Sequence, residues 1–496
     1  MPFAPGDPRI SVLREAPPAA HGRIVLYWMV AARRTRSNRA LSLALRHARH
    51  LRKPLVVFEP LRADYPWASR RLHHFVIEGM RDQARAFAST PIHYIPYVEP
   101  APRAARGLLE ALAREAAVVV TDRSPAFFLP RMLEAATAHV PCRFEAVDDN
   151  GVFPLDAATR VYPTAYSFRR FVQKTLPSVA GELLHPRDED LRDAPALSAA
   201  DTAWLAQVEA RWPSFPVEAD LSRSLAALPI DPSLRPASQT GGERAAQATL
   251  DRFLHDGLAR YGEDRNHPDL DRSSNLSPYL HFGHIAAADV CRRVLAQAGW
   301  AGECSSKTDG HREGWWGLDV NVEGFLDELI TWREVGLNAA AHLPRYDQFD
   351  TLPAWARDTL ARHAIDPRPT LYDFATLDGA DTHDELWNAA QWQLVTEGRL
   401  HNMLRMLWGK KILEWSATPE AAFEAMVRLN NRYAVDGRDP NSYSGIAWVL
   451  GRYDRAWGPE RPIFGTIRYM SSVNTARKVR VKQYLRRYAP STRLFA

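Results

Sequence analysis

An acid and an aromatic ring lie four residues apart in the segment FLDELITWRE, at Glu328 and Trp332. On an expected helix this spacing puts both side chains on one face. Together they can clasp a flat polar ligand, because the carboxyl group hydrogen-bonds to its edge and the indole stacks on its face. A solvated glutamate beside a half-buried tryptophan is the commoner alternative, so the spacing alone leaves both interpretations open.

Tryptophan is unusually frequent, with 15 residues in the chain. Trp408 and Trp415 are two helical turns apart, about 10.5 Å along one face of an expected helix. Trp387 precedes both in the same helical stretch. Aligned indoles can pass an electron by hopping, but large aromatics at helical spacing also form ordinary cores, and spacing alone favours a core.

Polar residues precede an expected helix in the segment DRSSNLSPYLHFG, at Ser274, Asn275 and Ser277. Hydroxyls, an amide and backbone N–H groups at such a place can bind phosphate oxygens. An ordinary helix cap is the alternative.

A second polar segment, LNNRYAVDGRDPN, places Asn430 and Asp436 beside an apolar helix. Asp436 can form a bidentate pair with Arg405. Asp-Gly and Asp-Pro-Asn are also ordinary turn sequences, so both interpretations stand.

The C-terminal segment is strongly basic. Residues 461–496 contain nine Lys and Arg and no Asp or Glu, with Tyr469, Tyr484 and Tyr488 between them, although the whole chain carries a formal charge of only +5. This bias suits a polyphosphate backbone. A solvated basic surface is the alternative.

The N-terminal part that must carry or support these groups alternates strands and helices. Short apolar runs predict buried strands at 24–30, 55–58, 92–98, 117–121 and 144–147. Helical spacing between them, at 40–50, 70–88 and 107–115, predicts an α/β domain over residues 22–150 with a parallel, five-stranded, Rossmann-like sheet. No GxGxxG motif follows the first strand, so a standard dinucleotide site is not expected.

Helical patterns dominate the second half. Residues 151–242 are punctuated by proline and are expected to form an interdomain linker. Residues 243–496 are expected to form an all-α domain with a basic DNA-binding end. Its helical segments are predicted at 243–259, 284–297, 322–339, 354–363, 385–415 and 419–432, with an inserted loop at 301–321.

Composition excludes several classes of protein. A chain of 496 residues that is 46% hydrophobic and 24% charged is not intrinsically disordered. Three cysteines without CxxC spacing exclude a disulfide framework and a four-cysteine metal site, and no metal is expected. Without a signal core or a long apolar run, we expect a cytoplasmic monomer that does not enter membranes, nucleoid-associated in a prokaryote.

Several long strings of the chain resemble the photolyase/cryptochrome superfamily, and most closely its class II cyclobutane pyrimidine dimer photolyases. The carrying strings are SNLSPYLHFG, THDELWNAAQ, LHNMLRMLWGKKILEW, LNNRYAVDGRDPN and ERPIFGTIRYM. The resemblance implies an α/β antenna-type domain, a linker and a helical domain that binds FAD without a covalent bond. The resemblance also allows a second, antenna chromophore, whose identity the sequence does not indicate.

The resemblance also implies roles for individual residues. Asn430 matches the position facing flavin N5, and Arg405 and Asp436, with Gly437 beside them, match the residues next to the isoalloxazine. The family positions that contact the FAD phosphates correspond to Tyr261, Ser274, Asn275, Leu276 and Ser277. The proximal, middle and distal members of the family's photoreduction chain correspond to Trp408, Trp387 and Trp415. The family positions that contact the DNA lesion correspond to Glu328, Trp332, Met406 and Trp448, and Arg468 corresponds to a basic position near the opened duplex.

The activity implied is light-driven repair of cyclobutane pyrimidine dimers in DNA. Excited reduced FAD (FADH⁻) would pass an electron to a flipped-out dimer. A cryptochrome-like blue-light photoreceptor without repair activity is the alternative, and a 6-4 photolyase is a second one. The lesion residues favour repair over the photoreceptor, and the whole-chain resemblance favours the dimer class over the 6-4 class. Departures from the family pattern are Asn402 in place of Gly, Gly409 in place of Ala and Arg39 in place of Trp.

Overall fold

The computed structural model describes residues 6–184 and 188–489. The chain forms two compact units, each assembled from three stretches of sequence. The first unit takes Met1–Ala158, Val179–Leu250 and Leu276–Arg293, and the second takes Thr159–Ser178, Asp251–Asn275 and Val294–Ala496. Each unit is described by itself below.

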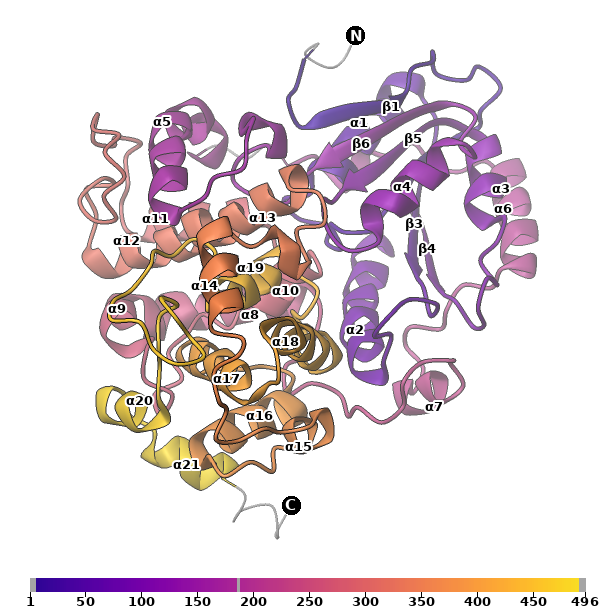
Figure 1. Cartoon of the computed structure of the whole chain (residues 1–496). Coiled ribbons are helices and arrows are strands. Elements are labelled where there is room, and N and C mark those ends of the chain that lie inside the picture. The colour runs from indigo at the N-terminus through magenta and orange to yellow at the C-terminus, as the bar shows by residue number, and fades with distance from the viewer. Residues whose placement is uncertain (1–5, 185–187, 490–496) are drawn as a thin grey trace. The chain divides into compact units, whose positions relative to one another are not determined.

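The first unit is built on a six-stranded sheet in the order β1-β6-β5-β2-β3-β4 (Figure 1). The strands are β1 (Ile10–Arg14), β2 (Ile24–Trp28), β3 (Leu55–Leu61), β4 (His93–Val98), β5 (Ala116–Arg123) and β6 (Arg143–Asp148). The five strands expected from the sequence are present and parallel, which confirms the α/β fold class. The count of five was wrong, because β1 adds an antiparallel sixth strand. This edge strand is only half-buried, so it lacks the continuous apolar run that marks the others.

The two faces of the sheet are covered by different helices because side chains alternate along each strand. Ile24 and Leu26 share one core with Leu112 and Leu205. Val25 and Tyr27 join the other core. The helices on the first face are α3 (Leu108–Arg114), α4 (Leu129–Thr137) and α6 (Ala199–Arg211), while α1 (Arg39–Leu51) and the end of α2 (Arg70–Phe87) lie on the second.

The loop after β2 is closed by an internal carboxylate. The backbone N–H groups of Val30, Ala31 and Ala32 all donate to Oδ2 of Asp122, at 2.8, 2.7 and 3.0 Å. Asp122 lies on β5, and β2 and β5 flank the point where the strand order reverses. In nucleotide-binding sheets, N–H groups at this point donate to a phosphate of the ligand. Here Asp122 accepts them instead, which agrees with the absence of a GxGxxG motif.

The segment 151–242, which is expected to be an interdomain linker, carries helices. They are α5 (Ala165–Leu184), α6 (Ala199–Arg211) and α7 (Leu221–Ala226). Leu221 and Leu225 of α7 pack with Val76 and Met80 of α2. The frequent prolines of this segment indicated an irregular chain, although α5 and α6 are 20 and 13 residues long. The domain boundaries at 150 and 242 remain a prediction.

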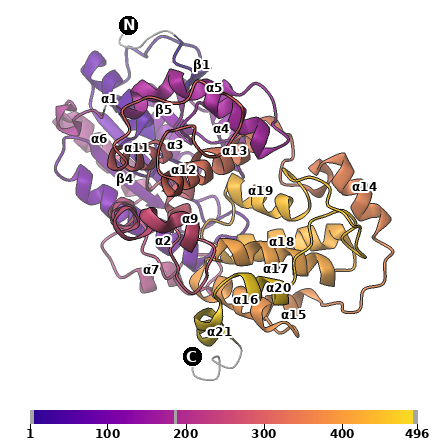
Figure 2. The same cartoon turned by 90° about the vertical axis from the view of Figure 1, so that its left-hand side faces the viewer.

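The second unit is helical. Around the candidate site it contains α9 (Tyr261–Asp264), α12 (Val320–Leu326), α13 (Arg333–His342), α14 (Ala354–Arg362), α15 (Phe374–Asp378), α16 (Glu385–Glu397), α17 (Asn402–Trp415), α18 (Pro419–Tyr433), α19 (Pro440–Val449), α20 (Ser472–Lys478) and α21 (Lys482–Tyr488). Figure 2 shows α16, α17 and α18 side by side. The first unit also holds α10 (Ser277–His281) and most of α8 (Glu243–Arg252) and α11 (Ala287–Gln297).

The helical stretch expected at 385–415 is two helices, not one. Gly398 adopts a left-handed conformation with φ 74° and caps α16, and α17 begins at Asn402. The break lets α17 pack against α16. It therefore places Trp387 on one helix and Trp408 and Trp415 on its neighbour. Within residues 6–184 and 188–489, every helix is too short or too polar to cross a bilayer.

Candidate active site

Arg405 on α17 lies at the centre of a polar cluster. Its Nη1 donates to Asn430 Oδ1 at 3.4 Å and to Ser442 Oγ at 3.2 Å, and its Nη2 is 3.5 Å from Asp436 Oδ1. The predicted contact with Asp436 exists, but the prediction that it is bidentate was wrong. The guanidinium is shared among three partners, so its fork cannot align with one carboxylate.

Asn430 is almost fully buried and its amide is held on two sides. Its Nδ2 donates to the Gly437 carbonyl and to Ser442 Oγ, both at 2.8 Å. A Cβ atom on Gly437 would lie 2.6 Å from the Asn430 carbonyl oxygen, so this turn has room only for glycine. Four predicted residues therefore meet here. Ser442 was missed, because a serine in the first turn of α19 carries no signal of its own.

The predicted phosphate-binding segment is organised by an arginine that sequence reasoning missed. Arg399 donates to both Asp271 oxygens, at 2.9 and 2.7 Å, and to Asn275 Oδ1 at 3.0 Å. Asn275 adopts a positive φ of 55°. Ser274, half-buried, precedes it. Leu276 and Ser277 belong to the first unit, where Ser277 begins the five-residue helix α10.

His401 has two buried ring nitrogens without a hydrogen-bond partner. Desolvation lowers the pKa of His401 to about 4, with Asp271 opposing and Arg399 adding to the shift. The ring is therefore neutral near pH 7 and offers one unsatisfied donor and one unsatisfied acceptor. Such groups cost free energy unless a ligand or water meets them. This orphaned imidazole, beside the Asp271–Arg399 pair, fits a binding site for a polar cofactor such as FAD.

The three tryptophans lie in the core of the second unit. Trp387, Trp408 and Trp415 are 0%, 2% and 2% exposed. Trp387 Nε1 donates to the Trp408 carbonyl at 3.0 Å, and the Trp387 and Trp415 rings meet edge to face with centroids 5.4 Å apart. Trp408 Nε1 donates to Gln391 at 2.8 Å. The three side chains are thus core residues, and Trp387 lies against both the Trp415 ring and the Trp408 backbone.

Glu328 and Trp332 lie on a π-helical turn, Asp327–Trp332, instead of the expected regular helix. Such turns occur often at functional sites. Arg265 Nη1 donates to Glu328 Oε1 at 2.5 Å, and its guanidinium lies 5.3 Å from the ring centre of Tyr261. Desolvation raises the pKa of Glu328, and Arg265 opposes this shift. Arg265 was missed because a lone arginine in a loop carries no pattern.

Trp448 on α19 is flanked by two cations. Arg468 lies 5.3 Å and the Lys410 ammonium 5.5 Å from its ring centre. Arg468 also donates to both oxygens of Asp454, at 3.0 and 3.2 Å. Arg468 is therefore anchored within the protein. Met406, half-buried, follows Arg405 on α17.

The basic C-terminal segment forms α20 and α21. Tyr484 and Tyr488 are buried, and their hydroxyls donate to Gln393 and Glu397 on α16 at 2.8 and 2.6 Å. They are core residues and do not present rings to a ligand. Within residues 461–489, the exposed basic side chains are Arg461, Arg477, Lys478, Arg480, Lys482, Arg486 and Arg487. Arg493 lies outside the described residues.

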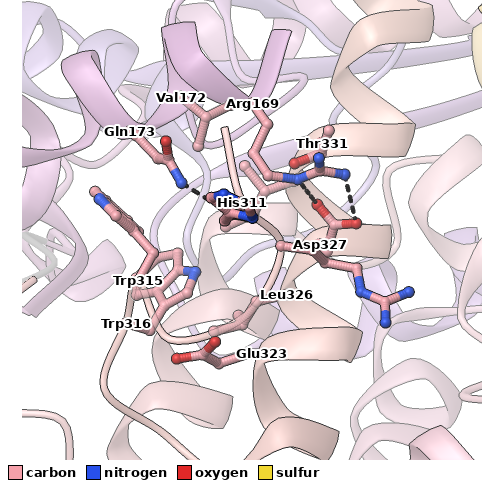
Figure 3. Close-up of a pocket in the computed structure, with 12 residues that line it drawn as sticks. Arg169, Val172, Gln173, His311, Trp315, Trp316, Glu323, Leu326, Asp327 and Thr331 are labelled. Atoms are coloured by element: carbon pink, nitrogen blue, oxygen red, sulfur yellow. Dashed lines mark hydrogen bonds and ion pairs between the residues drawn. The ribbon is translucent and has the colours of Figure 1, made fainter. Parts of the chain in front are cut away.

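The loop expected as an insertion at 301–321 has a defined structure. The Trp315 and Trp316 rings meet edge to face, with centroids 5.2 Å apart. Figure 3 shows the small cavity that they line with Arg169 and Asp327, which form a bidentate pair at 2.7 and 2.9 Å. The cavity volume is about 20 Å³, room for about one water. It is too small for a substrate, and its lining brings loop residues together with residues of the segment 327–332.

The departures from the family pattern have clear positions. Asn402 is exposed at the first turn of α17. A Cβ atom on Gly409 would lie 2.6 Å from Val449, so the packing as it stands favours glycine. Arg39, in the first unit, has its Nε 3.5 Å from Asp149.

Comparison with known proteins supports a common origin along nearly the whole chain. It is 34% identical over 484 residues to a deoxyribodipyrimidine photo-lyase of Methanothermobacter thermautotrophicus, covering 97% of each chain. It is 31% identical to a protein of the same name from Potorous tridactylus, covering 94% of this chain and 81% of that one. No family model matches the chain.

Solved structures show the same fold. A bacterial class III photolyase from Agrobacterium tumefaciens superposes with a TM-score of 0.67 at 18% identity, covering 95% of this chain and 87% of that one. An archaeal photolyase from Sulfolobus tokodaii, solved with two FAD molecules, superposes with a TM-score of 0.63 at 12% identity, covering 95% and 91%. At this identity the likeness supports the fold alone. The near full-length identity to the named relatives carries the assignment: the chain belongs to the deoxyribodipyrimidine photo-lyases of the photolyase/cryptochrome superfamily, enzymes of DNA photorepair.

Proposed function

We propose that this enzyme repairs cyclobutane pyrimidine dimers in DNA as a class II photolyase. The observation that carries the proposal is the packing of α16 to α19. It unites Arg405, Asn430 and Asp436 in one polar cluster and puts Trp408 three residues from Arg405 on the same helix. Residues three apart on a helix are neighbours. A flavin ring at this cluster would therefore lie next to the start of the tryptophan chain.

FAD would be held by the residues that the family resemblance indicates. Arg405 and Asp436 would lie beside the isoalloxazine, with Asn430 facing N5. The Asn275 amide and the orphaned His401 ring would meet polar groups of the cofactor, together with Tyr261, Ser274, Leu276 and Ser277. Bound reduced FAD would supply the excited-state electron for repair and take it back afterwards.

The protein would act on the dimer by binding and orienting it outside the duplex. A base must leave the stack to be reached, and this costs least where the base is damaged. Trp332 and Trp448 would replace lost stacking, with Met406 lining the pocket. Desolvation raises the pKa of Glu328, and its ion pair with Arg265 opposes this shift. Once protonated and released from Arg265, Glu328 would donate a hydrogen bond to a pyrimidine carbonyl and stabilise negative charge that develops there.

Two further elements belong to the proposal. DNA with pyrimidine dimers is the partner, and exposed basic residues of α20 and α21, with Arg468 near the lesion, would lie along its phosphates. The first unit would be the place for a second, light-harvesting chromophore if the enzyme carries one. The enzyme would act as a monomer in the cytoplasm.

A substrate panel tests the proposal. The purified protein is first examined for a flavin absorption spectrum, then reduced and illuminated with duplexes that carry a thymine dimer, a 6-4 photoproduct or no damage. We expect loss of the thymine dimer only, and only in the light. Repair of the 6-4 photoproduct alone would contradict dimer specificity, and a flavin spectrum without any repair would support the photoreceptor alternative.

A further inference from the structure

The distal tryptophan of the predicted chain, Trp415, has two further aromatic neighbours, Tyr372 and His383. The Tyr372 ring meets the Trp415 ring edge to face, with centroids 5.3 Å apart at 86°. The His383 ring lies 5.4 Å from Trp415. The Tyr372 backbone N–H donates to the Trp415 carbonyl at 3.1 Å, which fixes the pair in register. Trp415 is buried, whereas Tyr372 is half-buried and His383 exposed.

Tyr372 and His383 are joined by two hydrogen bonds. The Tyr372 hydroxyl oxygen is 2.6 Å from His383 Nδ1 and accepts from the His383 backbone N–H at 2.9 Å. In the tautomer that carries its proton on Nε2, His383 Nδ1 is free to accept the Tyr372 hydroxyl proton. A neutral imidazole at this distance is a suitable proton acceptor for a phenol.

We propose that Tyr372 is a fourth electron donor beyond Trp415, with His383 as its proton acceptor. The inference rests on the proposed function, because Trp415 must first lose an electron to the light-driven chain. One electron then passes from Tyr372 to the Trp415 radical cation, which returns to neutral tryptophan. The hydroxyl proton passes to His383 Nδ1. The products are a neutral phenoxyl radical at Tyr372 and an imidazolium at His383, so charge and electrons balance.

The charges around Trp415 favour this direction of transfer. Lys411 Nζ lies 5.4 Å from the centre of the Trp415 ring, and a nearby cation disfavours a second positive charge on the indole. Glu414 at 2.8 Å and Asp384 at 3.8 Å from Lys411 Nζ offset part of this effect. Tyr372 avoids the repulsion because its radical becomes neutral once the proton leaves. Because Tyr372 is half-exposed, a thiol reductant in solution could return one electron to its phenoxyl radical, and His383 would return the proton.

The experiment identifies the radical in the oxidised, flavin-loaded protein under blue light. Electron paramagnetic resonance is recorded with ordinary and with ring-deuterated tyrosine. We expect a phenoxyl signal that narrows on deuteration, and its loss in Tyr372→Phe, where only tryptophan radicals remain and decay faster. His383→Gln should lower the phenoxyl yield, because a carboxamide is a far weaker base.

A matched control uses another hydrogen-bonded tyrosine. Tyr488 donates to a Glu397 oxygen at 2.6 Å, and its ring contacts are Tyr484 and Arg487. Tyr488→Phe should leave the phenoxyl signal unchanged. An unchanged signal in Tyr372→Phe would overturn the inference and leave the Tyr372–His383 bond as a structural link only.

The repair assay separates this inference from the proposed function. The Tyr372→Phe enzyme, with its flavin chemically reduced beforehand, should repair dimers at the wild-type rate. Repair itself does not use the electron-transfer chain. A protein that repairs dimers yet forms the same radical without Tyr372 contradicts this inference alone. A protein that binds no flavin contradicts both proposals at once.

Discussion

At the scale of single residues, the site combines groups that sequence can suggest with partners that it cannot. Glu328 stands out in the sequence because Trp332 follows it at helical spacing. Its partner Arg265 lies in a different segment and has no distinguishing neighbours, yet the two form an ion pair at 2.5 Å. Arg399 and Ser442 likewise have no distinguishing sequence neighbours and contact residues that are distant in sequence. Residues whose role depends on a contact distant in sequence are found only once the chain is folded.

We expect Glu328→Ala to weaken binding of a dimer-containing duplex. The change removes a hydrogen-bonding acid and leaves Arg265 without its partner, a loss of about 1.5–3 kcal/mol, or at least about tenfold in Kd. The measurement is a binding titration against damaged and undamaged duplexes. Glu328→Gln, which keeps a donor, should retain more of the discrimination, and equal losses on both duplexes would contradict a lesion contact.

Lys410 should make stability depend on pH. Desolvation lowers the pKa of Lys410 to about 7, with Asp454 opposing and Arg468 adding to the shift. The unfolded chain therefore binds one more proton than the folded chain between pH 7 and about 10.5, and the free energy of unfolding falls as pH falls through that window. The free energy of unfolding changes by at most about 5 kcal/mol across this window, at about 1.4 kcal/mol per pKa unit.

Lys410→Met tests this by urea unfolding at pH 7 and pH 10. Removing the ammonium should flatten the pH dependence of unfolding in this window. Lys482→Met, at an exposed position on α21, is the control and should leave the slope as in wild type. An unaltered slope in Lys410→Met would show that this lysine stays charged in the folded enzyme.

At the scale of elements, the strongly periodic or continuously apolar segments were predicted, and the exceptions have local causes. The five buried strands followed from their apolar runs, whereas β1 lacked one because it is an edge. The stretch 385–415 kept its helical pattern across Gly398, so periodicity gave no sign of the break. The two π-helical turns, Phe253–Gly257 and Asp327–Trp332, also escape a 3.6-residue pattern.

Gly398→Ala should destabilise the protein by about 1–2 kcal/mol, because alanine pays the cost of the left-handed conformation. Gly324→Ala is the matched control. Gly324 lies inside α12, where a Cβ atom would meet nothing within 4 Å, so alanine should be neutral or stabilising by up to about 1 kcal/mol. Equal effects of the two changes on the urea midpoint would contradict the capping role of Gly398.

Trp408→Phe separates the two uses of light. If α16 and α17 carry the electron path, the variant should lose photoreduction of the oxidised flavin while the pre-reduced enzyme keeps most of its repair activity. Absorption spectra under blue light measure the first, and dimer loss measures the second. Loss of both activities would contradict a role limited to recharging the cofactor.

At the scale of the whole molecule, the weak net charge of +5 conceals a local concentration of basic residues on α20 and α21. Phosphate contacts release counterions, so DNA affinity should fall steeply with salt. Arg477→Glu and Lys482→Glu should each weaken binding to damaged and undamaged duplexes alike. Each substitution should reduce the slope of log association constant against log salt concentration by about one, because each phosphate contact contributes about 0.9 to that slope. An unchanged slope would place the DNA elsewhere.

Dimer repair itself is the central claim, and one measurement addresses it directly. The reduced protein is mixed with a duplex that carries a single thymine dimer, and intact thymines are quantified after blue light and after an equal time in the dark. The account predicts stoichiometric, then catalytic, return of the thymines in the light and none in the dark. Persistence of the dimer in the light, with reduced flavin bound, would contradict it.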